Sequence, residues 1–110
     1  MGKRDSLGEF EILILAALVR LGDRAYGAAV FREVEERTGR SIAMGAVYTT
    51  LYRLEEKRLI SSELGDPTPT RGGRAKRYFS IEAAGVEAIE RSVGALEAML
   101  ADTRLAWGAR

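Results

Sequence analysis

One short stretch of the chain gathers side chains that could bind an anion. Four cations fall within seven residues there, and they are Arg71, Arg74, Lys76 and Arg77. Guanidinium and ammonium groups attract phosphate oxygens, and the neighbouring Gly72 and Gly73 let the backbone come close to them. The spacing therefore indicates contact with a polyanion, although solvated charges are also common in loops.

Residues 44–57, which precede this stretch, offer a second set of polar groups. If they form a helix, steps of about 100° place Val47, Leu51 and Leu54 on one side. The opposite side carries small residues, hydroxyls and charges, and its members are Gly45, Thr49, Tyr52, Arg53 and Glu56. Hydroxyls and arginine can reach base edges and phosphates in DNA. The two sets together predict a nucleic-acid contact.

The composition argues against an enzyme. The chain has no histidine and no cysteine, so the commonest general base, the best nucleophile and a thiolate metal site are all missing. It also lacks a phosphate-cradling GxxxxGK motif. The adjacent acidic pairs Glu35-Glu36 and Glu55-Glu56 point about 100° apart on a helix and are better interpreted as solvated surface. We expect no catalytic residue, no cofactor and no metal.

The net charge of +1 hides an uneven distribution. Residues 40–80 carry eight basic and four acidic side chains, whereas residues 1–39 carry six and seven, and residues 81–110 carry three and five. A basic middle between acidic ends is expected where one surface meets a polyanion. A length of 110 residues and an apolar fraction of 46% suffice for a single domain with its own core.

Neither the N-terminus nor any apolar run predicts secretion or membrane insertion. The segment formed by residues 1–7 is short and charged. The longest apolar run, residues 12–19, is far shorter than the roughly 20 residues that a membrane span needs. The absence of cysteine also fits the cytosol. We therefore expect a cytoplasmic protein.

Periodicity and turn residues predict four helices and one hairpin. The helices are expected over residues 7–20, 25–38, 44–57 and 82–107, and the strands over residues 59–64 and 75–81. Ser6 and Glu9 have the spacing of a capping box, and Gly39 suits the end of the second helix. Both prolines fall in residues 65–74, which predicts an exposed hairpin tip.

The last helix has the clearest periodicity in the chain. Alternating steps of three and four connect Val86, Ile89, Val93, Leu96, Leu100, Thr103 and Trp107. Such a narrow seam suits packing against another helix, and a symmetric dimer would supply one. Packing on the first helix is the alternative. That helix is apolar all round over residues 12–19, so we expect part of it to meet a second subunit.

The predicted fold class is mainly α with a small β-hairpin. The order helix, helix, helix, strand, turn, strand is that of a winged helix-turn-helix, in which the third helix enters the major groove and the hairpin is the wing. We expect residues 1–81 to form a DNA-binding domain. Residues 82–110 are expected to form a C-terminal dimerisation helix within the same compact unit.

The chain also resembles a known family. The matching motifs are Tyr26-Gly27, GAVYTTLYRLE at residues 45–55, Leu59-Ile60, and GGRAKRYF at residues 72–79. This set of motifs in this order resembles the PadR family of transcriptional regulators. The resemblance covers about residues 7–86, and the chain is similar to the short-tailed members, whose C-terminal part is one helix.

The resemblance implies a homodimer, held by the first and last helices, that binds an inverted-repeat operator and usually represses transcription. It also implies that Tyr48 and its neighbours face DNA, that Tyr26 and Gly27 lie near the phosphate backbone, and that residues 72–74 form the wing turn. Two positions depart from the family pattern. Thr49 stands where many members have proline, and Glu82 replaces the usual threonine cap.

Together these arguments predict three groups of site residues. The DNA-binding group is Tyr26, Gly27, Gly45, Tyr48, Thr49, Tyr52, Arg53, Arg71, Gly72, Gly73, Arg74, Lys76 and Arg77. The dimer-interface group is Leu7, Phe10, Leu13, Ile14, Ala17, Val86, Ile89, Val93, Leu96 and Leu100. Trp107 is the candidate contact for a small-molecule effector, which the sequence does not identify.

The predicted function is that of a sequence-specific DNA-binding transcriptional regulator, a repressor, whose partners are double-stranded DNA and a second copy of the chain. Two alternatives remain. A winged helix can serve protein contacts alone, and its expected signature is an acidic or apolar wing with an apolar outer face on the third helix. A ligand-sensing module would keep the dimer seam but bind DNA only non-specifically.

Overall fold

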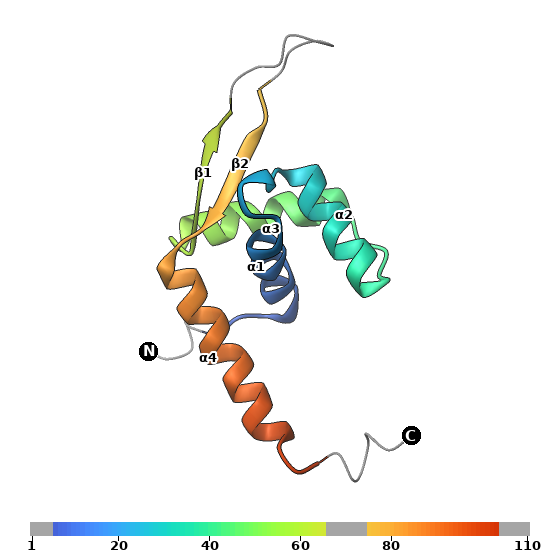
Figure 1. Ribbon diagram of the computed structural model, residues 1–110, viewed down its shortest axis with the longest axis vertical. Coiled ribbons are helices and arrows are strands. Elements are labelled where there is room, and N and C mark those ends of the chain that lie inside the picture. Colours follow the sequence, from blue (N-terminus) through green and yellow to red (C-terminus); the bar gives the residue numbers. More distant parts are fainter. Residues whose placement is uncertain (1–5, 66–74, 104–110) are drawn as a thin grey trace.

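The computed structural model describes residues 6–65 and 75–103. The elements are, in order, α1 (Glu9–Leu21), the short 3-10 turn η2 (Gly22–Arg24), α2 (Gly27–Thr38), α3 (Met44–Glu56), β1 (Ile60–Leu64), β2 (Arg77–Ile81) and α4 (Ala83–Leu100). In Figure 1 the hairpin and α4 extend from opposite sides of a body made by the first three helices. The predicted order of elements, mainly α with one hairpin, is confirmed.

A single core lies where the three helices and the hairpin meet. Its largest fully buried side chains come from all of these elements, and they are Phe79, Ile14, Leu15, Leu18, Leu51, Leu54, Val30 and Val47. Burying one such side chain contributes about 1.5–3 kcal/mol. Because Phe79 belongs to β2, the root of the wing is anchored in the same core as the helices.

The wing is held to the body by backbone pairing as well as by Phe79. β1 and β2 pair antiparallel from Ile60↔Ile81 to Leu64↔Arg77. A two-stranded hairpin alone is marginally stable in water. Here the segment before α2 adds a one-residue bridge, Tyr26↔Tyr78, and the Phe79 amide donates a hydrogen bond to the Ala25 carbonyl at 2.8 Å. This pairing fixes the wing relative to α2.

The structure corrects the expected start of the first helix. Gly8, and not Ser6, is the N-cap of α1, and its amide donates a hydrogen bond to Glu11 Oε1 at 3.1 Å. Leu7 packs against the core before the helix begins, which keeps the chain extended up to Gly8. The prediction for the second helix is confirmed, because Gly39 ends it in the left-handed conformation with φ 73°.

The last helix is shorter than predicted. α4 ends at Leu100, where Ala101 turns to ψ 135° and Asp102 adopts φ 64°. The Thr103 hydroxyl donates to the Leu100 carbonyl at 2.6 Å and so satisfies one of the free carbonyls at the helix end. The expectation of a continuous helix to residue 107 is therefore wrong at Ala101. Trp107 lies outside the described residues.

Candidate nucleic-acid interface

The outer face of α3 is the first part of the candidate interface. Val47, Thr50, Leu51 and Leu54 are buried against the other helices. The exposed positions form one stripe along the opposite side, and they include Gly45, Thr49, Tyr52, Arg53 and Glu56. This division is the one that the helical period predicted. It leaves hydroxyls, one arginine and a largely exposed Tyr52 ring facing outward, with no apolar patch.

Tyr48 of α3 packs against the start of α2. Its half-buried side chain lies directly over Gly27, and a Cβ atom at Gly27 would overlap the Tyr48 ring. Gly27 itself is buried. The glycine of the Tyr26-Gly27 motif therefore makes room for Tyr48, and Tyr26, which is half-buried, is the member of the pair that reaches the surface.

Tyr26, at the start of α2, contacts residues of both α2 and the wing. Its ring packs edge-on against Tyr78 of β2, with centroids 5.7 Å apart. Lys76 Nζ lies 4.9 Å from the centroid of the Tyr26 ring, a cation–π contact, and Arg32 Nη2 donates to the Tyr26 hydroxyl at 3.3 Å. The hydrogen bond from Arg32 holds the pKa of Tyr26 below its ordinary value, and the charges of Arg32 and Lys76 act in the same direction.

A second link connects the wing to α3. Arg77 Nη1 donates to the Ser62 hydroxyl oxygen at 3.0 Å, and the Ser62 hydroxyl donates to Glu55 Oε2 at 2.8 Å. Arg77 was predicted as a phosphate contact. The structure gives it a fixed position on the hairpin, tied through Ser62 to the C-terminal turn of α3. The other predicted wing residues, 71–74, lie outside the described residues.

Most cations of the described residues fall into two classes. The paired cations, Arg20, Arg37, Arg40 and Lys57, make ion pairs with carboxylates of α1 and α2. A second set makes no ion pair within residues 6–65 and 75–103, and we call them the unpaired cations: Arg24, Arg32, Arg53, Arg58, Lys76 and Arg77. They come from η2, α2, α3 and its end, and the wing. Positive charge is therefore left without neutralisation around the α3 stripe.

Comparisons with known proteins agree with this arrangement. The profile of the family described as the Transcriptional regulator PadR-like family matches residues 14–91, most of the chain. The chain belongs to the PadR-like family of transcriptional regulators. None of the curated proteins matches it in sequence.

Solved structures of PadR-like proteins share the fold. A PadR-like transcriptional regulator from Bacillus cereus is 20% identical, with 92% of each chain covered and a TM-score of 0.70. A PadR family regulator from Clostridium difficile is 25% identical over 84% of this chain and 98% of its own, with a TM-score of 0.64. One from Eggerthella lenta is 26% identical over 86% and 76%, with a TM-score of 0.66. The winged-helix fold with a C-terminal helix is thus shared.

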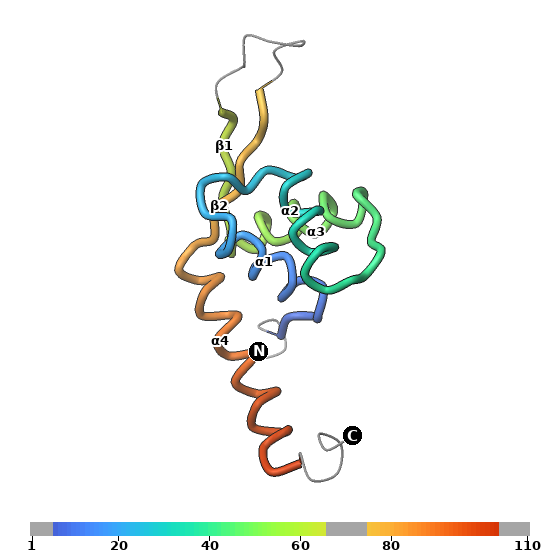
Figure 2. Tube along the Cα trace, turned by 45° about the vertical axis from the view of Figure 1, so that its right-hand side comes forward, coloured from blue at the N-terminus to red at the C-terminus, as the bar shows by residue number. Residues whose placement is uncertain are grey.

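The residues predicted for the dimer interface of this PadR-like protein divide into three sets. Ile14 and Ala17 are buried in the protomer's own core, which corrects the prediction that they face a partner. Leu7, Phe10, Leu13 and Ile89 are half-buried against that core. The seam of α4 stays largely open: Leu96 is 55% exposed, and Val86 and Leu100 are exposed as well. Figure 2 shows the second half of α4 projecting beyond the body.

Sequence reasoning missed two residues of the candidate interface. Arg24 and Arg32 were not predicted as site residues, yet both line a hollow beside the wing. A signal was present, because Arg32 follows Tyr26 by six residues and can reach back along α2 toward its first turn.

None of the described helices has both the length and the hydropathy to cross a membrane.

Proposed function

We propose that this PadR-like regulator is a sequence-specific repressor that binds an inverted-repeat operator in double-stranded DNA as a homodimer. Residues 1–81 would form the DNA-binding domain and residues 82–110 the dimerisation segment. The protein would act in the cytoplasm, and repression would follow because a bound dimer blocks access to the promoter.

The observation that carries the proposal is the outer stripe of α3 together with the unpaired cations. Hydroxyls and a tyrosine on a solvent-facing helix do not stabilise the fold by burial, and they suit contact with base edges. Arginine and lysine around them suit phosphates, which position the protein without reading sequence. We assign base contacts to Gly45, Thr49 and Tyr52. Arg53 is assigned to phosphates.

The open apolar seam of α4 supports the homodimer. Leu96 and Leu100 are exposed, and the neighbouring Met99 is 78% exposed. Apolar side chains that stand together on a projecting helix favour a protein partner over solvent. A second copy related by a two-fold axis would cover both seams at once and would present two α3 helices about one turn of DNA apart.

The proposal is tested by titrating the purified protein into labelled DNA from upstream of its own gene, and into a scrambled duplex of equal length. From about 50 to 200 mM salt, a repressor with several phosphate contacts loses about 10³-fold or more in affinity. We expect binding at two protomers per site that is at least about 10³-fold tighter for the upstream fragment. Equal affinity for both duplexes at every salt concentration would contradict the proposal.

The dimer is tested separately by placing a charge in the seam. Leu96→Glu should give a folded monomer in analytical ultracentrifugation, because Leu96 is exposed and its loss leaves no cavity. Ala95→Glu adds the same charge at the adjacent exposed position, off the seam, and should remain dimeric. If Leu96→Glu is still a dimer of unchanged affinity, α4 is not the dimerisation helix.

The two alternative functions predict other results. A winged helix used only for protein contacts would show no salt-dependent DNA binding, and its exposed α3 face would tolerate Thr49→Ala without effect. A ligand-sensing module without an operator would bind the two duplexes equally. The absence of an apolar outer face on α3 argues against the first alternative.

A further inference from the structure

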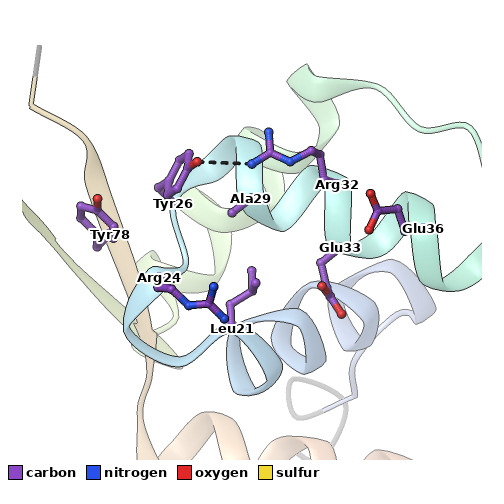
Figure 3. A pocket seen from close by; sticks show the side chains of 8 residues that line it. All are labelled: Leu21, Arg24, Tyr26, Ala29, Arg32, Glu33, Glu36 and Tyr78. Carbon is purple, nitrogen blue, oxygen red and sulfur yellow. Dashed lines mark hydrogen bonds between the residues drawn. The ribbon is translucent and has the colours of Figure 1, made fainter. Parts of the chain in front are cut away.

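A hollow lies between α2, η2 and the root of the wing, separate from the outer stripe of α3. Its volume is about 290 Å³, which is near the lower limit of ordinary small-molecule sites. Its lining residues are Leu21, Arg24, Tyr26, Ala29, Arg32, Glu33, Glu36 and Tyr78. Figure 3 shows these side chains, with Arg24 across the hollow from Arg32. The hollow therefore presents both apolar and charged groups to a ligand.

One side of α2 forms the floor of the hollow. Residues three or four apart share one side of a helix, and Ala29 shares its side with Arg32 and Glu33. Its methyl group is the shortest side chain on that side, so the hollow forms between longer neighbours. Leu21 at the end of α1 adds further apolar surface. The hollow is thus apolar at its floor and charged at its rim.

Two opposite charges stand on this side of α2 without pairing with each other. Arg32 and Glu36 are separated by one helical turn, a spacing at which ion pairs commonly form. Here Arg32 turns back instead, and its Nη2 donates to the Tyr26 hydroxyl at 3.3 Å. Within residues 6–65 and 75–103, Glu36 makes no ion pair. A cation and a carboxylate therefore line the same hollow but are held apart.

A second cation reaches the hollow from η2. Arg24 is exposed and makes no ion pair in the part of the chain that the structure describes. It faces the hollow from the side opposite to Arg32 (Figure 3). Two cations that share one space repel each other, and a carboxylate between them would relieve that repulsion and accept hydrogen bonds from both.

The other carboxylate that lines the hollow is already neutralised. Glu33 pairs with Arg20 at 2.9 Å and with Arg37 at 3.2 Å. Hydrogen bonds from Arg20 and then from Arg37 hold the pKa of Glu33 below its ordinary value, so Glu33 stays ionised and engaged with them. Of the two carboxylates that line the hollow, Glu36 is therefore the one left to accept a hydrogen bond from a ligand.

The backbone of α2 gives the hollow the same polarity as its side chains. α2 has no acidic residue in its first turn and no side-chain cap at Tyr26, so the positive end of its dipole is unopposed. Arg32 reaches toward that end, whereas Glu36 lies nearer the C-terminal end of the helix. The negative group of a ligand is thus favoured near Tyr26, and its positive group near Glu36. This feature supports the charged side chains and does not stand alone.

We infer that this hollow binds a small amino acid in its zwitterionic form. The carboxylate of the ligand lies between Arg24 and Arg32, and its ammonium group donates to Glu36. An apolar side chain packs on Ala29 and Leu21. A simple anion would leave Glu36 without a partner, and a simple cation would leave the two arginines facing each other. The inference goes beyond the proposed function, because it concerns a small ligand and does not depend on DNA binding.

The test titrates the ¹⁵N-labelled full-length protein, without DNA, with L-leucine and two analogues at constant ionic strength. Isocaproate keeps the carboxylate and the apolar chain of leucine but lacks the ammonium group, whereas isoamylamine lacks the carboxylate. Because the charged groups of the hollow are largely exposed, we expect a Kd for leucine of about 1 mM. Amide shifts should cluster at residues 24–36, and each analogue should bind at least about threefold more weakly than leucine.

Two variants separate a binding role from a structural one. Glu36→Gln removes the partner of the ammonium group and should weaken leucine binding about two- to fivefold. The same change should leave isocaproate binding unchanged or tighten it, because a negative charge near the carboxylate is lost. Arg32→Gln should weaken both ligands. A variant that merely disturbed the fold would weaken both ligands at either position, so the opposite responses to Glu36→Gln identify a contact with the ligand.

A third variant fills the hollow without changing its charge. Ala29→Leu places a larger side chain on the floor and should abolish the leucine-induced shifts. Ala84→Leu is the matched control, because Ala84 is exposed on α4 and does not line the hollow. The control should bind leucine with the affinity of the wild type.

Three results would overturn the inference. Equal affinities for leucine and isocaproate would make the hollow a site for anions and not for zwitterions. Leucine binding that Ala29→Leu leaves unchanged would place the ligand elsewhere, and the absence of any shift up to about 20 mM leucine would exclude the site. None of these results bears on the repressor proposal, because that proposal is tested by DNA binding.

Discussion

In the described part of the chain, cations on one face of the molecule make ion pairs with carboxylates, whereas cations on the other face do not. On the side of α1, Arg40 bonds to both carboxylate oxygens of Glu9, at 2.7 and 3.1 Å, and Arg20 and Arg37 share Glu33. The unpaired cations, around the start of α2, the outer face of α3 and the wing, make no ion pair among the described residues. Surface ion pairs contribute little stability, so the unpaired cations cost the fold little. The difference indicates that one face is internally neutralised, whereas the other is left to attract an external anion.

The largest expected effect comes from the residue that seats α3 against α2. Gly27→Ala forces Tyr48 away from α2 and should lower the free energy of unfolding by about 1–3 kcal/mol. It should also reduce operator affinity at least about tenfold, because α3 moves relative to the wing. Urea denaturation and fluorescence anisotropy measure the two effects.

Gly45→Ala is the matched control for that change. A Cβ at Gly45 meets open space, and the substitution should stabilise the helix by about 0.5–1 kcal/mol. It should alter preference among operator sequences without a general loss of binding. Equal destabilisation by both glycine substitutions would show that the contact with Tyr48 is unimportant.

The next effect compares an unpaired with a paired arginine. Arg53→Ala should weaken binding to every duplex about tenfold and reduce the salt slope by about one. Arg40→Ala removes the same charge from the neutralised side and breaks its ion pair with Glu9. It should leave stability close to that of the wild type, with little effect on DNA affinity. If the Arg53→Ala and Arg40→Ala variants lose DNA affinity equally, DNA affinity depends on the net charge of the protein and not on the position of the arginine.

A smaller effect is expected where the wing is tied to α3. Ser62→Ala removes the hydroxyl between Arg77 and Glu55, and should cost about 0.5–1.5 kcal/mol of stability and a few-fold in operator affinity. Ser61→Ala is the control, since Ser61 makes no side-chain hydrogen bond among the described residues. Identical DNA affinities of the two serine variants in anisotropy titrations would show that Ser62 does not position Arg77 for DNA binding.

The smallest expected effect is a pH dependence of stability that arises from the ion pairs of Glu33. Hydrogen bonds from Arg20 and then from Arg37 lower the pKa of Glu33 below 4.5. Because the folded pKa lies below the unfolded one, the stabilisation is present above about pH 4.5 and is lost as the pH falls through the folded value. Between about pH 6 and pH 3 the urea midpoint of Glu33→Gln should fall less than that of the wild type. A Glu33→Gln curve parallel to that of the wild type would contradict the assignment.

Local patterns in the sequence predicted the elements and the face of α3. A helical period divides Leu51 and Leu54 from Thr49 and Arg53 without any knowledge of neighbours. Gly39 likewise predicted a helix end, because a left-handed C-cap is a local requirement. These features depend on backbone geometry within a few residues, and for that reason they could be predicted from the sequence.

Contacts between distant segments could not be read in the same way. An all-round apolar α1 does not reveal that Ile14 and Ala17 face its own core. The seam of α4 continues in sequence past Leu100, whereas the helix stops there. Nothing local connects Lys76 with Arg32, since only the folded chain brings both to Tyr26. The seating of Tyr48 over Gly27 is likewise a tertiary contact.

The face that binds DNA is located most directly by mapping backbone amide shifts of the ¹⁵N-labelled protein as its upstream DNA is added, at equal concentrations of dimer and duplex. We expect the shifts to cluster at residues 26–32, 45–53 and 76–78, where most of the unpaired cations and most of the α3 stripe lie. Residues 33–40, which include the paired Arg37 and Arg40, should stay unchanged, and so should the start of α1, which holds the carboxylates that pair with Arg40 and Lys57. Shifts that cluster on the paired side, or that spread evenly over both faces, would contradict the claim that the unneutralised face binds DNA.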